Sequence, residues 1–394
     1  MNTNRPEGHV AELSDRMRSF IDDEVIPAES ALVREDDDAR RVLDQLRTRA
    51  KELGLWALGH PSDVGGGGVD FLDFVYLNEI IGRSDFGQLA VGSVSMQDTL
   101  MLRKHGTEEQ KRRWIPPLVA GDFLPSVGLT EPEVAGSDPT LIETTAVLDG
   151  DTWVINGHKW FTTGVADAGY CSVFARTESD DVPRHSRISS IIVPTDTPGF
   201  DIVRSIPTMG HDPSDHYEVR LTDVRVPAAN LLGERGKGFV VAQDRLGPGR
   251  IFHCMRWLGQ AQRAYELMCA RANTRFVHGS LLAEKGEIQR YIAESAAEIQ
   301  AARLMTLDAA RVMDSGADAR VQIGLIKFWG ARMVHNVIDR AIQVHGALGL
   351  TADTPLERMY RHARYARVYD GPDEVHRMST ARRLLRDPGA APWL

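Results

Sequence analysis

The chain has 394 residues, of which 42% are hydrophobic and 26% charged, and its formal net charge is -9. This length and composition are typical of a globular protein with two or three domains. The acidic balance argues against nucleic acid as the main partner, and no apolar run approaches the roughly 20 residues that a membrane span requires.

The first part of the chain is expected to be helical. Apolar residues at helical spacing predict helices near residues 13–21, 39–53 and 71–82. The four glycines at 65–68 follow no predicted strand, so they indicate a turn and not a phosphate-binding loop. We therefore predict an N-terminal helical domain over residues 1–125.

The middle and the end of the chain differ in pattern. Short runs rich in β-branched or aromatic residues, separated by turn residues, predict a small antiparallel β domain over residues 126–235. Helical periodicity then returns, for example over residues 287–313, and predicts a helical bundle over residues 236–394.

Several common signatures are missing. The chain has no P-loop, no Rossmann fingerprint and no dense histidine motif, so we expect no metal site, and its histidines are assigned packing roles. Three scattered cysteines fit a reducing compartment. Residues 1–7 lack an apolar leader and residues 391–394 lack a peroxisomal address, which together with the cysteines predicts a cytoplasmic location.

Three stretches are less ordinary. Residues 129–138 (LTEPEVAGSD) concentrate hydroxyls and turn-formers, either as an inter-domain loop or as a ligand-lining loop. Residues 155–164 (INGHKWFTTG) place aromatic and hydroxyl side chains after an Asn-Gly turn, which suits either a core strand or the wall of a planar cofactor site. In residues 369–377 (YDGPDEVHR), Gly371 and Pro372 predict a helix start as N-cap and first helical residue, and Asp370 before them is a candidate base.

One charged loop remains ambiguous. Arg184 and Arg187, within residues 180–187, either meet the phosphates of a ligand or belong to a solvated loop, and the sequence favours the solvated loop.

These stretches, in this order and spacing, resemble the acyl-CoA dehydrogenase family, whose pattern is T-E-P-x-A-G-S-D, then N-G-x-K-x-[WF]-[IT]-[TS], then a Tyr-carboxylate-Gly turn. The resemblance extends over nearly the whole chain, including residues 259–264 and 343–349. Residues 246–256 (LGPGRIFHCMR) and the turn D-G-P-D-E-V-H are most similar to the subgroup called family members 10 and 11.

The resemblance implies a mainly α fold with a middle β domain: an N-terminal helical domain, a β-barrel-like domain and a C-terminal four-helix bundle. It also implies a homodimer or homotetramer that uses FAD to dehydrogenate an acyl-CoA thioester to the trans-2-enoyl-CoA. Asp370 would remove the α-proton as general base, and the β-hydrogen would leave as hydride to flavin N5. An electron-transferring flavoprotein is the acceptor that the family resemblance implies.

Site residues follow from matching positions. The cofactor contacts implied by the resemblance are Leu129, Thr130, Ser137, Phe161, Thr163, Arg275, His278, Gln343, Gly346, Gly349 and Glu374. The substrate contacts implied are Ser137, Arg250 and Gly371, to which Arg184 and Arg187 are added as candidates for the CoA phosphates.

The chain also departs from the family pattern. Asp370 stands where most members have glutamate, the loop 131–138 is one residue longer than usual, and His278 replaces a phenylalanine. Some members carry the base on an earlier helix beside the residue matching Arg250; that neighbour is Gly249 here, which cannot serve.

Rival functions stay open at this point. An acyl-CoA oxidase or a nitroalkane oxidase shares the fold, and nitroalkane oxidases also use an aspartate base. A flavin-bearing nucleic-acid-binding protein is a more remote alternative, against which the net charge of -9 counts.

Overall fold

The computed structural model describes residues 8–211 and 214–390, so the terminal residues used to predict a cytoplasmic location lie outside the described residues. The described parts of the chain divide into two compact units. Of the described residues, one unit is formed from 8–59, 67–93 and 247–390, and the other from 60–66, 94–211 and 214–246. We call them the helical unit and the sheet unit. The predicted boundaries of three domains stay a prediction.

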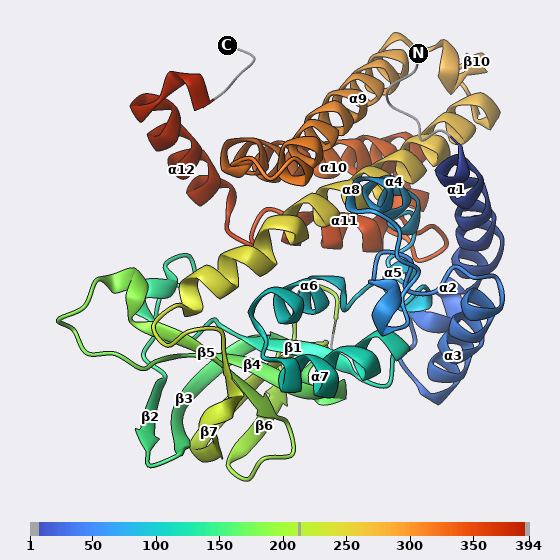
Figure 1. Ribbon diagram of the computed structural model, residues 1–394. Coiled ribbons are helices and arrows are strands. Elements are labelled where there is room, and N and C mark those ends of the chain that lie inside the picture. The colour runs from blue at the N-terminus through green and yellow to red at the C-terminus, as the bar shows by residue number, and fades with distance from the viewer. Residues whose placement is uncertain (1–7, 212–213, 391–394) are drawn as a thin grey trace. The chain divides into compact units, whose positions relative to one another are not determined.

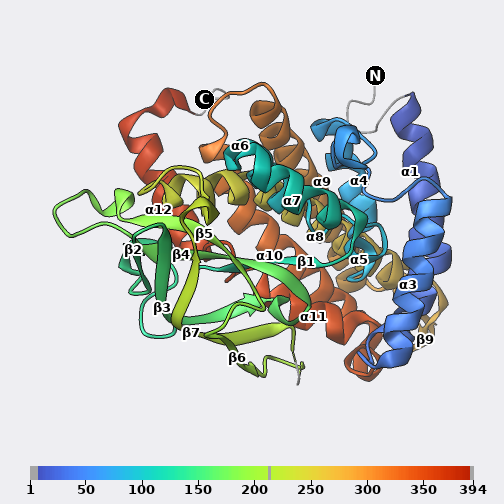
Figure 2. The same ribbon diagram turned by 60° about the horizontal axis from the view of Figure 1, so that its bottom comes forward.

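In the described part of the sheet unit, eight strands form one sheet in the order β6-β7-β3-β2-β4-β5-β8, with β1 beside β4. Strands β3, β7 and β6 lie next to one another in Figure 2. The strands are β1 (Leu124–Gly128), β2 (Thr145–Asp149), β3 (Thr152–Thr163), β4 (Ala168–Arg176), β5 (Ile188–Pro194), β6 (Phe200–Ser205), β7 (His216–Pro227) and β8 (Leu231–Leu232).

The sheet is mixed, which corrects the prediction of a purely antiparallel domain. Strand β1 runs parallel to β4, and β2 also meets β4 in parallel. Parallel neighbours need a long connection, and a sequence pattern of alternating residues carries no sign of strand direction. One face of the sheet buries Trp153, Val173 and Ile191 in a common core.

Helices α6 (Met96–His105) and α7 (Glu108–Ala120) lie entirely within the sheet unit. Helix α7 begins at a capping box, in which Thr107 and Gln110 each accept a backbone N–H of the other. Its Trp114 packs on Tyr170 of β4 with ring centroids 4.9 Å apart, which fixes α7 on the sheet.

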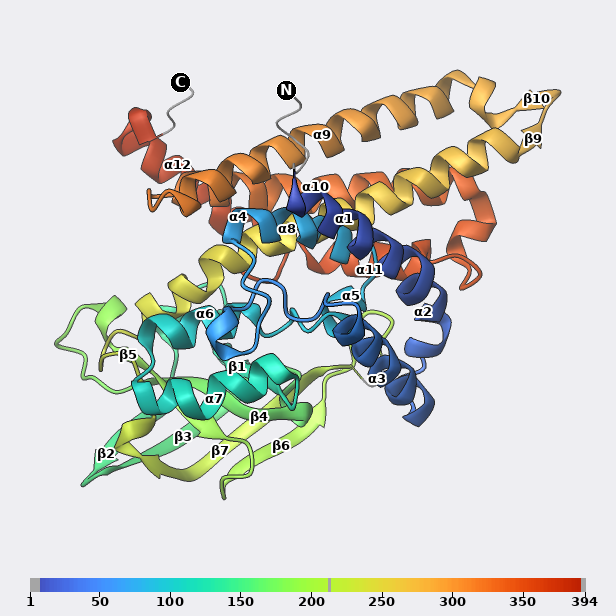
Figure 3. The same ribbon diagram turned by 45° about the vertical axis from the view of Figure 1, so that its right-hand side comes forward.

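The helical unit holds the predicted helices near residues 13–21, 39–53, 71–82 and 287–313, which are confirmed. Helix α8 begins in the sheet unit and continues into the helical unit. The short hairpin β9–β10 connects the ends of α8 and α9 (Figure 3). The elements are α1 (His9–Phe20), α2 (Ile26–Leu32), α3 (Asp37–Glu52), α4 (Phe71–Ile81), α5 (Gly87–Ala90), α8 (Gly238–Thr274), β9 (Phe276–Val277), β10 (Ser280–Leu281), α9 (Gly286–Asp314), α10 (Arg320–His345), α11 (Leu356–Tyr365) and α12 (Asp373–Arg386).

Helices α4 and α8 cross at a pair of glycines. A Cβ atom on Gly259 would lie 2.1 Å from the carbonyl oxygen of Glu79, and one on Gly82 would lie 2.2 Å from the Cα of Arg256. Such distances leave no room for a side chain, so the two backbones touch directly. This contact fixes where the face of α8 that carries Arg250 to Trp257 lies within the helical unit.

None of the described helices combines the length and the apolarity that crossing a membrane requires. The order of helices, sheet and helices along the chain (Figure 1) is the predicted order, and the predicted mainly α fold class with a middle sheet is confirmed.

Candidate active site

Asp370 lies in the turn between α11 and α12, and its backbone is in the left-handed region with φ 54°. Gly371 follows with φ 94°. The carbonyl oxygen of Asp370 accepts hydrogen bonds from Arg250 Nε and from His376 Nε2, each at 3.0 Å. Two donors on one carbonyl hold the turn in place from both α8 and α12.

The predicted helix start is wrong by one residue. Helix α12 begins at Asp373, and Pro372 is its N-cap, whereas Gly371 was expected to be the N-cap. The reason is the left-handed backbone conformation of Gly371, because of which the helix begins one residue later in the chain. Asp373 is buried and lies 2.9 Å from Arg367 Nε, so the acidic first turn is anchored as well as compatible with the helix dipole.

A buried lysine on α10 also donates hydrogen bonds to backbone carbonyl groups of this turn. Lys327 on α10 donates from Nζ to the carbonyl oxygens of Ala366, at 2.8 Å, and Gly371, at 3.2 Å. Its amino group also lies over the rings of Trp257 and Tyr369, 5.3 Å from each centroid. Burial lowers the pKa of Lys327 to about 8, so the side chain is still mostly charged at neutral pH.

The carboxylate of Asp370 faces a histidine. His253 Nε2 lies 3.3 Å from Asp370 Oδ2, but the two groups do not meet the geometry of a hydrogen bond. On the other side of the ring, Arg256 Nη2 donates to His253 Nδ1 at 2.8 Å. Burial, with Arg256 nearby, lowers the pKa of His253 to about 4, so this ring is neutral at pH 7.

Sequence reasoning assigned His253 a packing role and gave no function to Lys327. Arg250, His253 and Trp257 are three and four residues apart on α8, which places them on one helix face. That spacing was the available signal, but their common partner lies in a turn far along the chain.

The sheet unit holds a buried ion pair under the loop 129–138. Lys159 Nζ lies 2.7 Å from Glu131 Oε1, and both side chains are at most 2% exposed. Glu131 also accepts the backbone N–H groups of Glu143 and Thr144, and Lys159 donates to the carbonyl of Leu129. Burial acts to raise the pKa of Glu131, but Lys159 lowers it on balance. The loop is therefore tied to β3 by charge.

The hydrogen-bonded pairing of strand β3 with β7 is interrupted at the aromatic residues Trp160 and Phe161. Pairing with β7 is irregular between Lys159 and Thr162, and Phe161 inside the break has φ 50°. Phe161 is 43% exposed and packs against Trp160 and His216, with centroids 5.1 and 5.4 Å away. A β-bulge of this kind turns a side chain out of the sheet.

The bulge region has the side chains that a planar flavin requires. It offers an exposed aromatic ring, the exposed hydroxyl of Thr163, and, among the described residues, a buried Trp160 Nε1 without a hydrogen-bond partner. Buried polar groups are normally satisfied, so an orphaned donor beside an exposed ring suits a polar aromatic ligand. Thr163 Oγ1 lies 2.9 Å from His216 Nδ1, which fixes the hydroxyl. These residues fit the flavin that the resemblance implies.

The structure brings some of the predicted residues together. Thr130 joins the aromatic segment, because its carbonyl accepts the N–H of Trp160 at 3.1 Å. Arg250 meets the Asp370 turn. Ser137 is exposed in its loop, and Arg187 is engaged by Asp180, 2.7 Å away, while Arg184 is exposed.

Other predicted residues lie apart. The hairpin after α8, where His278 has φ 45°, is at the opposite end of the helical unit from α12 (Figures 1 and 3). Arg275 and His278 therefore do not meet the Asp370 turn within one chain. Gly349 is packed against Ile342 at the end of α10, where Gln343 and Gly346 are exposed, and Glu374 is exposed on α12.

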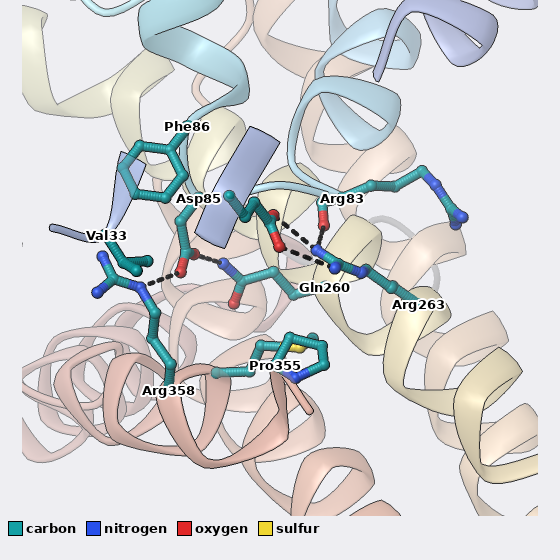
Figure 4. A pocket seen from close by; sticks show the side chains of 10 residues that line it. Val33, Arg83, Asp85, Phe86, Gln260, Arg263, Pro355 and Arg358 are labelled. Atoms are coloured by element: carbon teal, nitrogen blue, oxygen red, sulfur yellow. Dashed lines mark hydrogen bonds and ion pairs between the residues drawn. The ribbon is translucent and has the colours of Figure 1, made fainter. Parts of the chain in front are cut away.

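A separate hollow in the helical unit is lined by paired charges (Figure 4). Arg358 and Gln260 both point at Asp85, and Arg263 binds both carboxylate oxygens of Glu29 at 2.8 Å. Burial acts to raise the pKa of Asp85, but His362 and the arginines lower it to about 2. Because its charges are matched within the chain, this hollow is a structural network and not the site of Asp370.

Family models match the chain in three consecutive parts. Residues 9–122 match the acyl-CoA dehydrogenase N-terminal domain, residues 126–224 the middle domain, and residues 236–385 the C-terminal domain. The probable acyl-CoA dehydrogenase FadE2 of Mycobacterium tuberculosis is 43% identical over 94% of each chain. Mouse acyl-CoA dehydrogenase family member 10 is 39% identical over 97% of this chain, which spans only 38% of that longer protein.

Solved structures give the same result. A putative acyl-CoA dehydrogenase from Mycobacterium abscessus aligns with a TM-score of 0.90 and 38% identity, covering 97% of this chain and 99% of that one. A glutaryl-CoA dehydrogenase from Mycobacterium smegmatis, solved in complex with FADH2, aligns with a TM-score of 0.84 and 25% identity, covering 98% and 97%. The resemblance seen in the sequence, including that to family member 10, is confirmed.

Proposed function

The chain belongs to the acyl-CoA dehydrogenase family, and from this premise we propose that it oxidises an acyl-CoA thioester to the trans-2-enoyl-CoA, with Asp370 as the base. The cofactor is FAD, as in the related glutaryl-CoA dehydrogenase. When bound, FAD supplies the acceptor for the β-hydrogen. The observation that carries the proposal is the Asp370 turn, whose backbone carbonyl oxygens accept hydrogen bonds from side chains of three helices and which bears the Asp370 carboxylate.

The residues of this chain have separate tasks in the reaction. Asp370 takes the α-proton of the thioester as general base, a contribution of about 10² to 10⁴ in rate. Arg250 and Lys327 hold the backbone of its turn, so the carboxylate is aimed before substrate arrives. Aspartate is one methylene shorter than glutamate, so the position of the turn or of the bound acyl chain must supply about one bond length of reach.

Flavin contacts are proposed at the sequence-matched positions. Phe161 and Thr163 offer the ring and hydroxyl described above, and Leu129 and Thr130 belong to the loop tied down by Glu131. The other proposed contacts are Ser137, Arg275, His278, Gln343, Gly346, Gly349 and Glu374.

Substrate contacts are proposed at Ser137, Arg250 and Gly371. Arg184 and Arg187 stay candidates for the CoA phosphates; because Arg187 already pairs with Asp180, Arg184 is the stronger of the two. We further propose an electron-transferring flavoprotein as the acceptor and a homodimer or homotetramer as the assembly.

Anaerobic flavin bleaching tests the reaction class. The purified flavoprotein is mixed with acyl-CoAs of graded length and with nitroalkanes, and flavin absorbance is followed. Bleaching by acyl-CoAs alone supports the proposal, whereas bleaching only by nitroalkanes would assign it to the rival class. Fast reoxidation of the bleached flavin by oxygen would identify an acyl-CoA oxidase.

The base is tested by Asp370→Asn. We expect unchanged flavin content and bleaching at least about 10²-fold slower, because asparagine fits the turn but cannot take a proton. Asp353→Asn is the matched control, since Asp353 is an exposed acid of the same unit. Bleaching by Asp370→Asn at the wild-type rate would remove Asp370 from the mechanism.

A further inference from the structure

We propose that His253, held by Arg256 with its proton on Nε2, is a positioning residue that orients the carboxylate of Asp370. The inference rests on the proposed function, because it assigns the supporting residue of the proposed base. It arises from a contact that sequence reasoning did not foresee, between α8 and the turn before α12.

The tautomer of His253 follows from its neighbour. A guanidinium group has only donors, so the Nδ1 atom that receives the Arg256 bond must carry a lone pair. The ring proton is then on Nε2, the nitrogen that faces Asp370 Oδ2. A cationic ring would set two donors against each other at Nδ1, so Arg256 keeps His253 neutral as well as oriented.

The ring is also fixed in space. Tyr369 packs against His253 with centroids 4.8 Å apart, and Trp257 stacks near it at 6.1 Å with an interplanar angle of 26°. Trp257 Nε1 donates to the hydroxyl of Tyr369 at 2.8 Å, which ties the two flanking rings together. His253 is thus confined by rings on its flanks and by an arginine at its back.

A fixed N–H beside a carboxylate restricts its rotation. Asp370 has two side-chain torsions, and misplacing a base by about 1 Å can cost about 10²-fold in rate. The two atoms are 3.3 Å apart here without the geometry of a hydrogen bond, and catalytic contacts that are long or poorly aligned commonly tighten when substrate binds. His253 keeps its proton throughout, so its role is orientation and not proton relay.

Three variants separate the N–H donor from the ring. His253→Gln retains an N–H near the position of Nε2, and His253→Leu removes it. Arg256→Met removes the donor to Nδ1, so the ring proton of His253 can occupy either nitrogen. His335→Leu on α10 is the matched control, because its ring packs on Tyr360 and not on the Asp370 turn.

The reaction is followed at two steps. Proton abstraction is measured alone with a 3-thiaacyl-CoA, which has an α-proton but no β-hydrogen, as deuterium uptake from D2O by mass spectrometry. Flavin bleaching by an acyl-CoA measures the whole half-reaction. Flavin content and thermal stability report folding.

We expect His253→Leu to slow deuterium uptake and bleaching by a common factor of about 10 to 100, with KM within about threefold. His253→Gln should recover most of the rate, and Arg256→Met should fall between. Equal rates for wild type and His253→Leu, or a His253→Gln variant as slow as His253→Leu, would overturn the inference.

The tautomer is measured without variants. With 15N-labelled histidine, the spectrum of the holoenzyme should show His253 neutral and protonated at Nε2, and a Nδ1–H or cationic ring would overturn the inference even if His253→Leu fails to fold. If wild type neither exchanges the α-proton nor bleaches with any acyl-CoA, the proposed function fails instead, and the tautomer result still stands on its own.

Discussion

The buried pair Lys159–Glu131 makes a sharp prediction for Lys159→Met. Both side chains are at most 2% exposed and their charged atoms are 2.7 Å apart, so methionine leaves Glu131 as a buried carboxylate without its counterion. Removing one partner of a buried pair costs about 3–5 kcal/mol. Glu131 keeps the N–H groups of Glu143 and Thr144, so we expect the lower end, about 3 kcal/mol.

The assay is urea unfolding of the variant and of the double variant Lys159→Met, Glu131→Gln, with two spectroscopic probes because the chain has two compact units. The double variant should recover at least about 1 kcal/mol, since the orphaned charge is gone. Lys111→Met is the control: Lys111 pairs with Glu108 at 2.9 Å but on the surface, where a loss below about 1 kcal/mol is expected. Equal losses for Lys159→Met and Lys111→Met would refute the reasoning.

Two further predictions concern the helical unit. The folded-state pKa of Lys327, about 8, lies below the ordinary value of 10.5, so between these pH values the unfolded chain binds more protons than the folded chain. The free energy of unfolding of the wild type should therefore rise by up to roughly 3 kcal/mol as the pH increases from 8 to 10.5. Lys327→Met should lack this rise. Urea unfolding at pH 7 and pH 10 measures the difference, and parallel pH profiles for wild type and variant would contradict it. Gly259→Ala should cost about 3 kcal/mol or more, because its Cβ would lie 2.1 Å from the Glu79 carbonyl. Gly286→Ala, with nothing within 4 Å, should change stability by less than about 0.5 kcal/mol, and similar urea midpoints for the two alanine variants would count against the crossing contact.

The sequence predicted the helices whose apolar residues recur with a clear helical period, and it did not predict contacts between segments that are distant in the chain. The helix over 287–313 is α9, since its apolar spacing is local information. The parallel pairing of β1 with β4 was missed, because strand direction depends on the path of the chain between them. The start of α12 was misplaced because the pattern Gly-Pro fits two positions and only the φ of Gly371 decides between them.

The candidate site divides in the same way. Asp370 and the aromatic run at 160–161 stood out by residue type and order, and Arg250 was found through the resemblance to the family. His253 and Lys327 did not, because a lone histidine or lysine in a helix resembles any packing or surface residue until its partner is known. Their roles come from tertiary contacts with one turn.

The left-handed backbone of Asp370 narrows the amino acids that this position accepts. At φ 54° glycine is unstrained, and aspartate and asparagine are the side chains that visit the region most readily, whereas longer side chains bear a cost of about 1–3 kcal/mol. The short base is therefore the one that suits its turn. Asparagine at this position alters the chemistry and leaves the backbone preference intact, while glutamate would change reach and strain together.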